Sequence, residues 1–174
     1  KNPTSGLTRS EMLDKGDVFF FGTTNWITWL FPCKKRSCSL DSIIATEEEL
    51  LEFKSSRDLQ GKVLLSLNRV LRLYGFQLAN ADGVQSIDRA SDFDTKKNSW
   101  LKPDNPNLNR IARILQSLML VGLTRVAGMW LLALEQTAQE FPSDVGDMID
   151  YWRSSVQDPS EWQRGGRYGK AGGF

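Results

Sequence analysis

Carboxylates, lysine, tyrosine and cysteine remain possible sources of acid–base or nucleophilic chemistry in this chain, whereas histidine is absent from the sequence. This absence excludes a histidine general base, a Ser-His-Asp or Cys-His pair, and an imidazole metal ligand. The two cysteines, Cys33 and Cys38, bound the basic segment Cys33-Lys34-Lys35-Arg36-Ser37-Cys38. Two thiols do not complete a zinc site without other ligands. A disulfide across this short loop is sterically possible, but two reduced loop cysteines are the simpler interpretation, and the pairing stays open.

Carboxylates recur toward the C-terminal part of the chain, where Asp144, Asp147 and Asp150 are spaced three residues apart. On a helix this spacing makes them neighbours on one face. A metal or acid–base role would require facing groups from elsewhere in the chain. We therefore interpret these acids as a solvated face near a helix start, where the helix dipole favours negative charge. The sequence predicts no catalytic residues, no metal site and no cofactor, and therefore a protein that is not an enzyme.

Three aromatic residues, Trp26, Trp29 and Phe31, lie immediately before Pro32. They could line an aromatic groove that binds a peptide. Alternatively, they could be buried anchors against long helices, because an aromatic side chain buries about 150–250 Å². Burial is the simpler interpretation, and the three residues are candidates for a binding site under the other.

Cationic side chains offer two more candidate sites. Arg110 and Arg113 lie three residues apart beside an apolar stripe, so their guanidinium groups could bind a carboxylate or phosphate. Internal pairing with Asp or Glu is the alternative. Lys34, Lys35 and Arg36 could contact an acidic partner, although a solvated run of charge is the simpler interpretation.

The last residues are rich in glycine and carry the cations Arg164 and Arg167 beside Trp162 and Tyr168. Such a segment can bind single-stranded nucleic acid through stacking and charge, or become ordered along a partner protein. A flexible end without a function is the third interpretation.

The overall composition predicts one globular domain. The chain has 174 residues, of which 40% are hydrophobic and 25% charged, and its 22 basic and 21 acidic residues nearly cancel. This balance argues against nucleic acid as the main partner. No stretch reaches the roughly 18 apolar residues of a membrane span, although peripheral membrane association stays open. We expect an intracellular protein of unknown compartment, or an organellar one if a targeting segment was removed before Lys1.

Hydrophobic periodicity predicts a mainly α protein, a compact antiparallel bundle of about five helices with an irregular N-terminal arm and a Gly-rich C-terminal tail. The arm covers residues 1–22, the helical domain 23–156 and the tail 157–174. The expected elements are a short helix at 26–31, a helix opened by Asp41 or by the capping box at Thr46, and a long helix at 56–74. We then expect a loop over 79–106 pinned by Trp100, a helix after Pro106 capped by Asn107, and helices opened by Thr124 and Ser143.

Four segments in order resemble the conserved region of the opioid growth factor receptor family. They are Ile27-Thr28-Trp29-Leu30-Phe31-Pro32, Phe53-Lys54-Ser55-Ser56, Tyr74-Gly75-Phe76-Gln77-Leu78, and Asn109 to Leu118 followed by Gly122-Leu123. Trp100 also falls where that family tends to carry a tryptophan. The likeness spans roughly residues 25–152. The chain departs from the pattern where Thr23, Thr24 and Asn25 replace a usual histidine, and where Trp26 replaces a tyrosine.

The resemblance implies a helical domain and suggests a peptide ligand, because the family is named for enkephalin binding by an animal member. From the residues themselves, we predict a non-catalytic helical interaction module that acts as an accessory or scaffolding subunit of a larger assembly. Its main partners would be other protein subunits. A receptor domain for a peptide or small ligand is the alternative.

Overall fold

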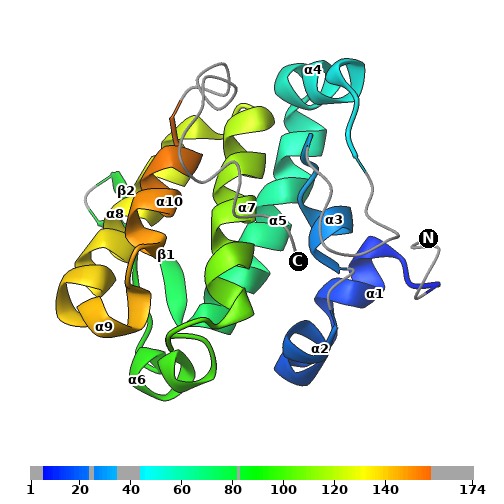
Figure 1. Cartoon of the computed structure of the whole chain (residues 1–174). Coiled ribbons are helices and arrows are strands. Elements are labelled where there is room, and N and C mark those ends of the chain that lie inside the picture. The colour runs from blue at the N-terminus through cyan, green and yellow to red at the C-terminus, as the bar shows by residue number, and fades with distance from the viewer. Residues whose placement is uncertain (1–5, 24–25, 35–43, 82, 158–174) are drawn as a thin grey trace.

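The fold is a set of packed α-helices with one small β-hairpin at its side (Figure 1). The computed structural model describes residues 6–23, 26–34, 44–81 and 83–157. The long helices are α5 (Arg57–Tyr74), α7 (Pro106–Leu120) and α8 (Thr124–Glu140), and the shorter α10 (Met148–Ser155) packs against both α7 and α8. The predicted mainly α, compact fold is confirmed.

The N-terminal part is helical where an irregular arm was predicted, so that prediction is wrong for residues 9–22. It forms α1 (Arg9–Leu13) and α2 (Asp17–Gly22). A capping box between Thr8 and Glu11 starts α1, and this Thr-Arg-Ser-Glu spacing is the sequence signal for the helix. Arg9 donates to the Ser66 hydroxyl of α5, and Arg69 of α5 forms an ion pair with Asp17 at 2.8 Å. These contacts hold both short helices against the body of the protein.

Two shorter helices form at the positions that the sequence predicts. The helix α3 (Trp26–Leu30) falls within the predicted short helix at 26–31, and Thr24 and Asn25, the residues from which we expect its cap, lie outside the described residues. The helix α4 (Glu47–Ser55) starts at Thr46 with both hydrogen bonds of a capping box.

The helix α5 also matches its prediction, with Ser56 as its N-cap and Gly75 as its C-cap. Gly75 has φ +81°, and a Cβ there would lie 2.8 Å from the Cα of Phe93. Only glycine satisfies both the left-handed conformation and this close approach.

The stretch 79–106 contains regular structure, so the prediction of a long loop is wrong. It includes most of an antiparallel hairpin of β1 (Phe76–Ala81) and β2 (Val84–Arg89), followed by α6 (Phe93–Lys96) and the 3-10 turn η1 (Lys97–Ser99). Only two residues, 82 and 83, join the strands, and their Asp-Gly sequence is a strong hairpin signal. Ile87 faces the core, whereas the other side of the ribbon is solvated, which gives the polar pattern of a loop.

Three details at the C-terminal helices differ from expectation. Asn105, not Asn107, caps α7, with Pro106 in the first turn. Thr124 is the first residue of α8 rather than its cap, and makes no capping bond. The predicted helix from Ser143 is split into α9 (Pro142–Val145) and α10, because Gly146 has φ +54° and ψ −141°, which no helix accommodates.

Buried tryptophans join the helices across the core. The indole nitrogen of Trp26 donates to the Phe20 carbonyl, and that of Trp100 donates to the Tyr74 carbonyl. Trp100 therefore pins the segment after the hairpin to α5, as predicted. Tyr74 lies between Trp100 and Trp130, with ring centroids 5.3 and 6.4 Å away.

Candidate functional site

The aromatic group before Pro32 is mainly part of the core. Trp26 and Phe31 are 1% and 0% exposed, and Trp29 is half-buried. Side chains buried to this degree do not contact a ligand without rearrangement. The structure therefore supports anchoring for Trp26 and Phe31, and a binding role for Trp29 stays a prediction.

Arg110 is engaged with oxygen atoms of the protein itself. Its guanidinium donates to the carbonyls of Phe20 and Thr23 at 3.1 and 3.3 Å, and to Asn107 Oδ1 at 2.9 Å. These acceptors replace the carboxylate partners that the sequence suggested. The arginine thereby connects α7 to the segment that ends α2. Arg113 lies one turn further along α7 and is half-buried.

The same network includes a buried phenol. Tyr74 donates to Asn107 Oδ1 at 3.2 Å, so this one oxygen accepts from both Tyr74 and Arg110. Burial raises the pKa of Tyr74 well above its usual range, and the nearby charge of Arg110 opposes that rise only in part. Tyr74 is therefore a neutral structural group at ordinary pH.

Of the basic loop, only the first cation is described. Lys34 forms an ion pair with Glu47 at 2.9 Å, and this hydrogen bond, followed by the charge of Lys34, lowers the pKa of Glu47. Both side chains are well exposed, so the pair contributes little stability. Cys33 is a free, buried thiol whose sulfur lies 4.0 Å from Gln116 Oε1. The candidates Lys35, Arg36, Arg164 and Arg167, together with Cys38, lie outside the described residues.

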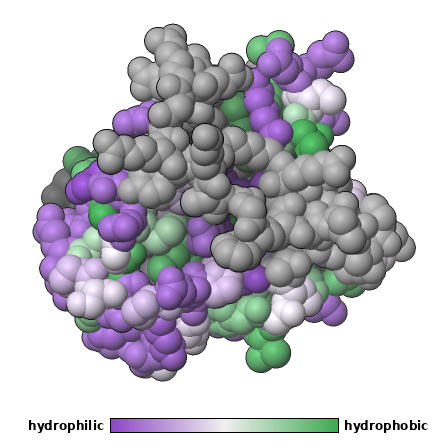
Figure 2. All heavy atoms as spheres, viewed as in Figure 1, coloured by the Kyte–Doolittle hydropathy of each residue, from purple (hydrophilic) through white to green (hydrophobic). Residues whose placement is uncertain are grey.

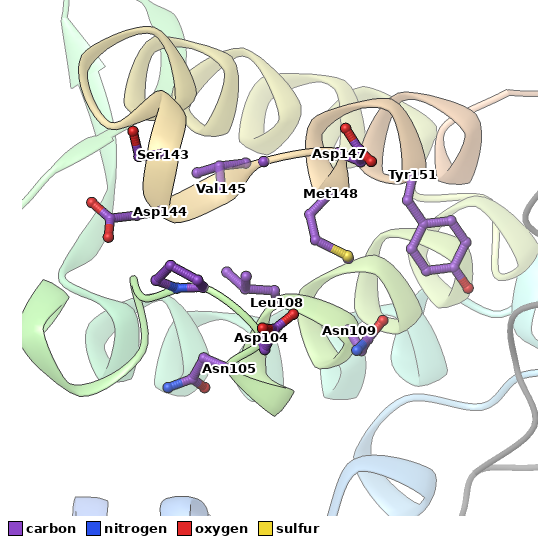
Figure 3. Close-up of a pocket in the computed structure, with 12 residues that line it drawn as sticks. Asp104, Asn105, Leu108, Asn109, Ser143, Asp144, Val145, Asp147, Met148 and Tyr151 are labelled. Atoms are coloured by element: carbon purple, nitrogen blue, oxygen red, sulfur yellow. The ribbon is translucent and has the colours of Figure 1, made fainter.

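A groove that the sequence analysis did not identify lies between the start of α7 and the α9–α10 segment (Figure 3). Its volume is about 420 Å³. One wall comes from residues 103–109 and the other from residues 143–151. Asp104 and the Met148 side chain point into the space between the walls, and Tyr151 stands at one end. We call this feature the α7–α10 groove.

The floor of the α7–α10 groove is apolar and its edges are acidic. Among its apolar lining residues, Met148 and Tyr151 are half-buried and accessible, whereas Leu108 and Val145 are 2% and 3% exposed and belong to the core. Asp104 lies on one wall, and Asp144 and Asp147 lie on the other. The lining contains no Lys or Arg, and no ion pair in the described part of the chain involves these three acids.

The helix starts at the α7–α10 groove reduce this negative charge but do not cancel it. The first turns of α7, α9 and α10 all meet there, and a long helix carries about half a positive charge at its N-terminus. Because α9 has only four residues, it contributes less than half a positive charge. Three full carboxylate charges therefore outweigh the dipoles, and the site favours a cation. The expected solvated face is only partly correct, because Asp150 pairs with Arg153 while Asp144 and Asp147 edge the groove.

Neither a metal cluster nor a membrane helix is found within the described residues. No group of three Cys, Asp or Glu side chains there is arranged to hold a metal ion. None of the helices described is long and apolar enough to cross a membrane. Exposed apolar residues are distributed over separate elements, as with the green patch over α2, the helix that carries the 86% exposed Val18 (Figure 2).

The fold and groove define a mainly α-helical domain with a concave groove on its surface. The sequence of residues 22–170 matches the model of the opioid growth factor receptor conserved region. The chain belongs to this family, as its four sequence segments suggested. The match extends past residue 156, into the stretch that was predicted to be a tail.

Individual relatives share part of their length with this chain. It is 29% identical to the opioid growth factor receptors of Rattus norvegicus, Mus musculus and Homo sapiens, over 136 residues in each case. The alignment covers 76% of this chain but 23%, 21% and 20% of those proteins. The chain thus spans under a quarter of the length of the relatives it matches. No solved structure matches it.

Proposed function

We propose that this chain is a non-catalytic protein-interaction domain that holds a segment of a partner protein in the α7–α10 groove. The observation that carries the proposal is the combination of an apolar floor with solvated carboxylates at the edge. A volume of about 420 Å³ falls within the usual range of ligand pockets, roughly 300–1,000 Å³. In this role the chain would be an accessory or scaffolding part of a larger assembly. An intracellular location stays a prediction of the sequence.

The buried contacts between the two walls support a binding role. α10 packs closely on α7, and the Trp152 indole donates to the Leu108 carbonyl at 2.9 Å. Trp152 and Leu108 are both buried, so this hydrogen bond joins the two walls inside the core. A site that is already formed loses little conformational entropy when it binds.

A second candidate function is a receptor domain for a peptide. The relatives named above are called opioid growth factor receptors, and this name supports a peptide ligand for the shared region. The same groove would then bind a free peptide rather than a segment of a stable partner. The two functions differ in the lifetime and stoichiometry of the complex.

The test is affinity capture with the full chain as bait, followed by native mass spectrometry, for three forms of the protein. Met148→Lys fills the α7–α10 groove with a cation, and Leu51→Lys places the same group on exposed α4, away from the groove. We expect a stoichiometric partner with the wild type and with Leu51→Lys, and its loss with Met148→Lys. A partner that survives Met148→Lys would contradict the groove as the contact site. Capture of a short peptide alone would favour the receptor function.

A further inference from the structure

We propose that the occupant of the α7–α10 groove is a basic segment of the partner, with an arginine or lysine side chain lying along the apolar floor and its charge at the carboxylates. This inference rests on the proposed function and names the chemistry of the ligand. The inference depends on two features of the groove together, its apolar floor and the negative charge at its edges.

The arrangement of the lining matches the two parts of a long cationic side chain. Met148 and Tyr151, which are half-buried, provide apolar surface between the walls, on which a methylene stem can pack. Asp104 on one wall and Asp147 on the other both belong to the lining, so the charged end of such a side chain would meet a carboxylate at the edge of the groove. A guanidinium group can donate to a carboxylate at the edge of the groove, which a wholly apolar ligand cannot do.

Other classes of ligand fit this groove less well. An anion would meet three carboxylates and no cation in the lining. A wholly apolar segment would cover the floor but would remove Asp104 and Asp144 from water without a compensating partner, which is unfavourable. A bare metal ion lacks a cluster of ligands among the described residues. Charge complementarity therefore favours a basic segment.

The carboxylates are available for such a ligand. Elsewhere in the described chain, acids such as Asp17 and Glu140 are already paired with Arg69 and Arg89. Asp104, Asp144 and Asp147 take part in none of these ion pairs. Asp104 and Asp147 are exposed, so replacing either carboxylate by an amide should leave the fold intact.

The experiment measures fluorescence anisotropy of labelled peptides with the full chain. The probe contains arginines between leucine and alanine residues, and two matched peptides carry glutamine or glutamate in place of arginine. We expect saturable binding of the arginine peptide, weaker binding of the glutamine peptide and none of the glutamate peptide. Raising the ionic strength from about 0.05 M to about 0.5 M should weaken the arginine complex, because salt screens exposed charges.

Single substitutions test whether the arginine peptide binds at the carboxylates of the α7–α10 groove. Asp104→Asn and Asp147→Asn should each weaken binding of the arginine peptide about two- to five-fold, as expected for exposed ion pairs. Asp14→Asn removes an exposed carboxylate from the end of α1, outside the groove, and should leave binding unchanged. Circular dichroism melting curves of the three variants check that each is folded.

Several results would overturn the inference. These are an arginine peptide that does not bind, a glutamine peptide that binds equally well, or an Asp14→Asn variant that loses as much affinity as Asp104→Asn. Failure of the proposed function itself has a different signature. If a captured partner is lost with Met148→Lys but kept when Asp104 and Asp147 are both amides, the groove is a contact site whose ligand is not basic.

Discussion

The indole nitrogen of Trp152 donates a 2.9 Å hydrogen bond to the carbonyl of Leu108, and this bond joins the two walls of the α7–α10 groove from inside the core. Trp130, which is equally buried, has an indole nitrogen with no acceptor among the described residues. Trp152 and Trp130 are thus equally buried, but only the indole nitrogen of Trp152 donates a hydrogen bond to a described residue.

Replacing each of these tryptophans by phenylalanine separates the hydrogen bond from the packing. Both changes remove a similar volume, but only Trp152→Phe removes a hydrogen bond, so it should destabilise the protein by about 1 kcal/mol more than Trp130→Phe. Urea unfolding of the two variants measures the difference. Equal losses would mean that the Trp152 hydrogen bond contributes nothing beyond packing. Trp152→Phe should also lower the affinity of the α7–α10 groove for its ligand, because the two walls of the groove then lack the hydrogen bond that joins them.

Gly75 and Gly61 differ in the space around them, so replacing each by alanine should have opposite effects on stability. Gly75→Ala would place a Cβ 2.8 Å from the Phe93 backbone at φ +81°, so we expect a loss of at least about 2 kcal/mol in the free energy of unfolding. Gly61 lies inside α5, with no atom within 4 Å of an added Cβ. Gly61→Ala should therefore stabilise the protein by about 0.5–1 kcal/mol. Thermal melting of both variants tests the prediction, which a stable Gly75→Ala protein would contradict.

The buried phenol of Tyr74 predicts a dependence of stability on alkaline pH. The pKa of Tyr74 is raised in the folded state, whereas in the unfolded chain it is about 10. Above that pH the unfolded chain loses the proton and the folded protein keeps it, so the free energy of unfolding falls as pH rises. Tyr74→Phe should remove this part of the alkaline loss while keeping the ring stacking. Urea midpoints from neutral pH up to alkaline pH, compared with the wild type, measure it, and identical slopes would exclude Tyr74 as the cause.

The cap of α7 is expected to matter for both stability and the groove. Asn105 Oδ1 accepts from the backbone nitrogen of Asn107 at 3.0 Å, and Asn105 also lines the groove. Asn105→Ala should lower the free energy of unfolding by about 1 kcal/mol. Asn105→Asp retains an acceptor at the same place and should keep most of that stability. Hydrogen exchange of the first turn of α7 tests the local effect, because only the alanine variant should exchange faster there.

Local signals in the sequence were sufficient for several elements. The apolar positions of α5, its Ser56 cap and its Gly75 end are visible without any structure, because helix periodicity and capping act over a few residues. The capping box at Thr46 is local in the same way. The hairpin was missed although Asp82-Gly83 signals it, because its solvated face makes the pattern read as polar loop.

Taken alone, the sequence determined the mainly helical class, the family and the exclusion of histidine chemistry, since each depends on composition or on short segments. The tertiary structure decided what individual side chains contact. Arg110 donates to the carbonyls of Phe20 and Thr23, which lie 90 and 87 residues away in the chain. The α7–α10 groove likewise exists only because α10 packs on α7, which places Asp104 and Asp147 in the lining of one groove. No spacing along the chain encodes this proximity, because it depends on where Gly146 breaks the helix and on how Trp152 packs against α7.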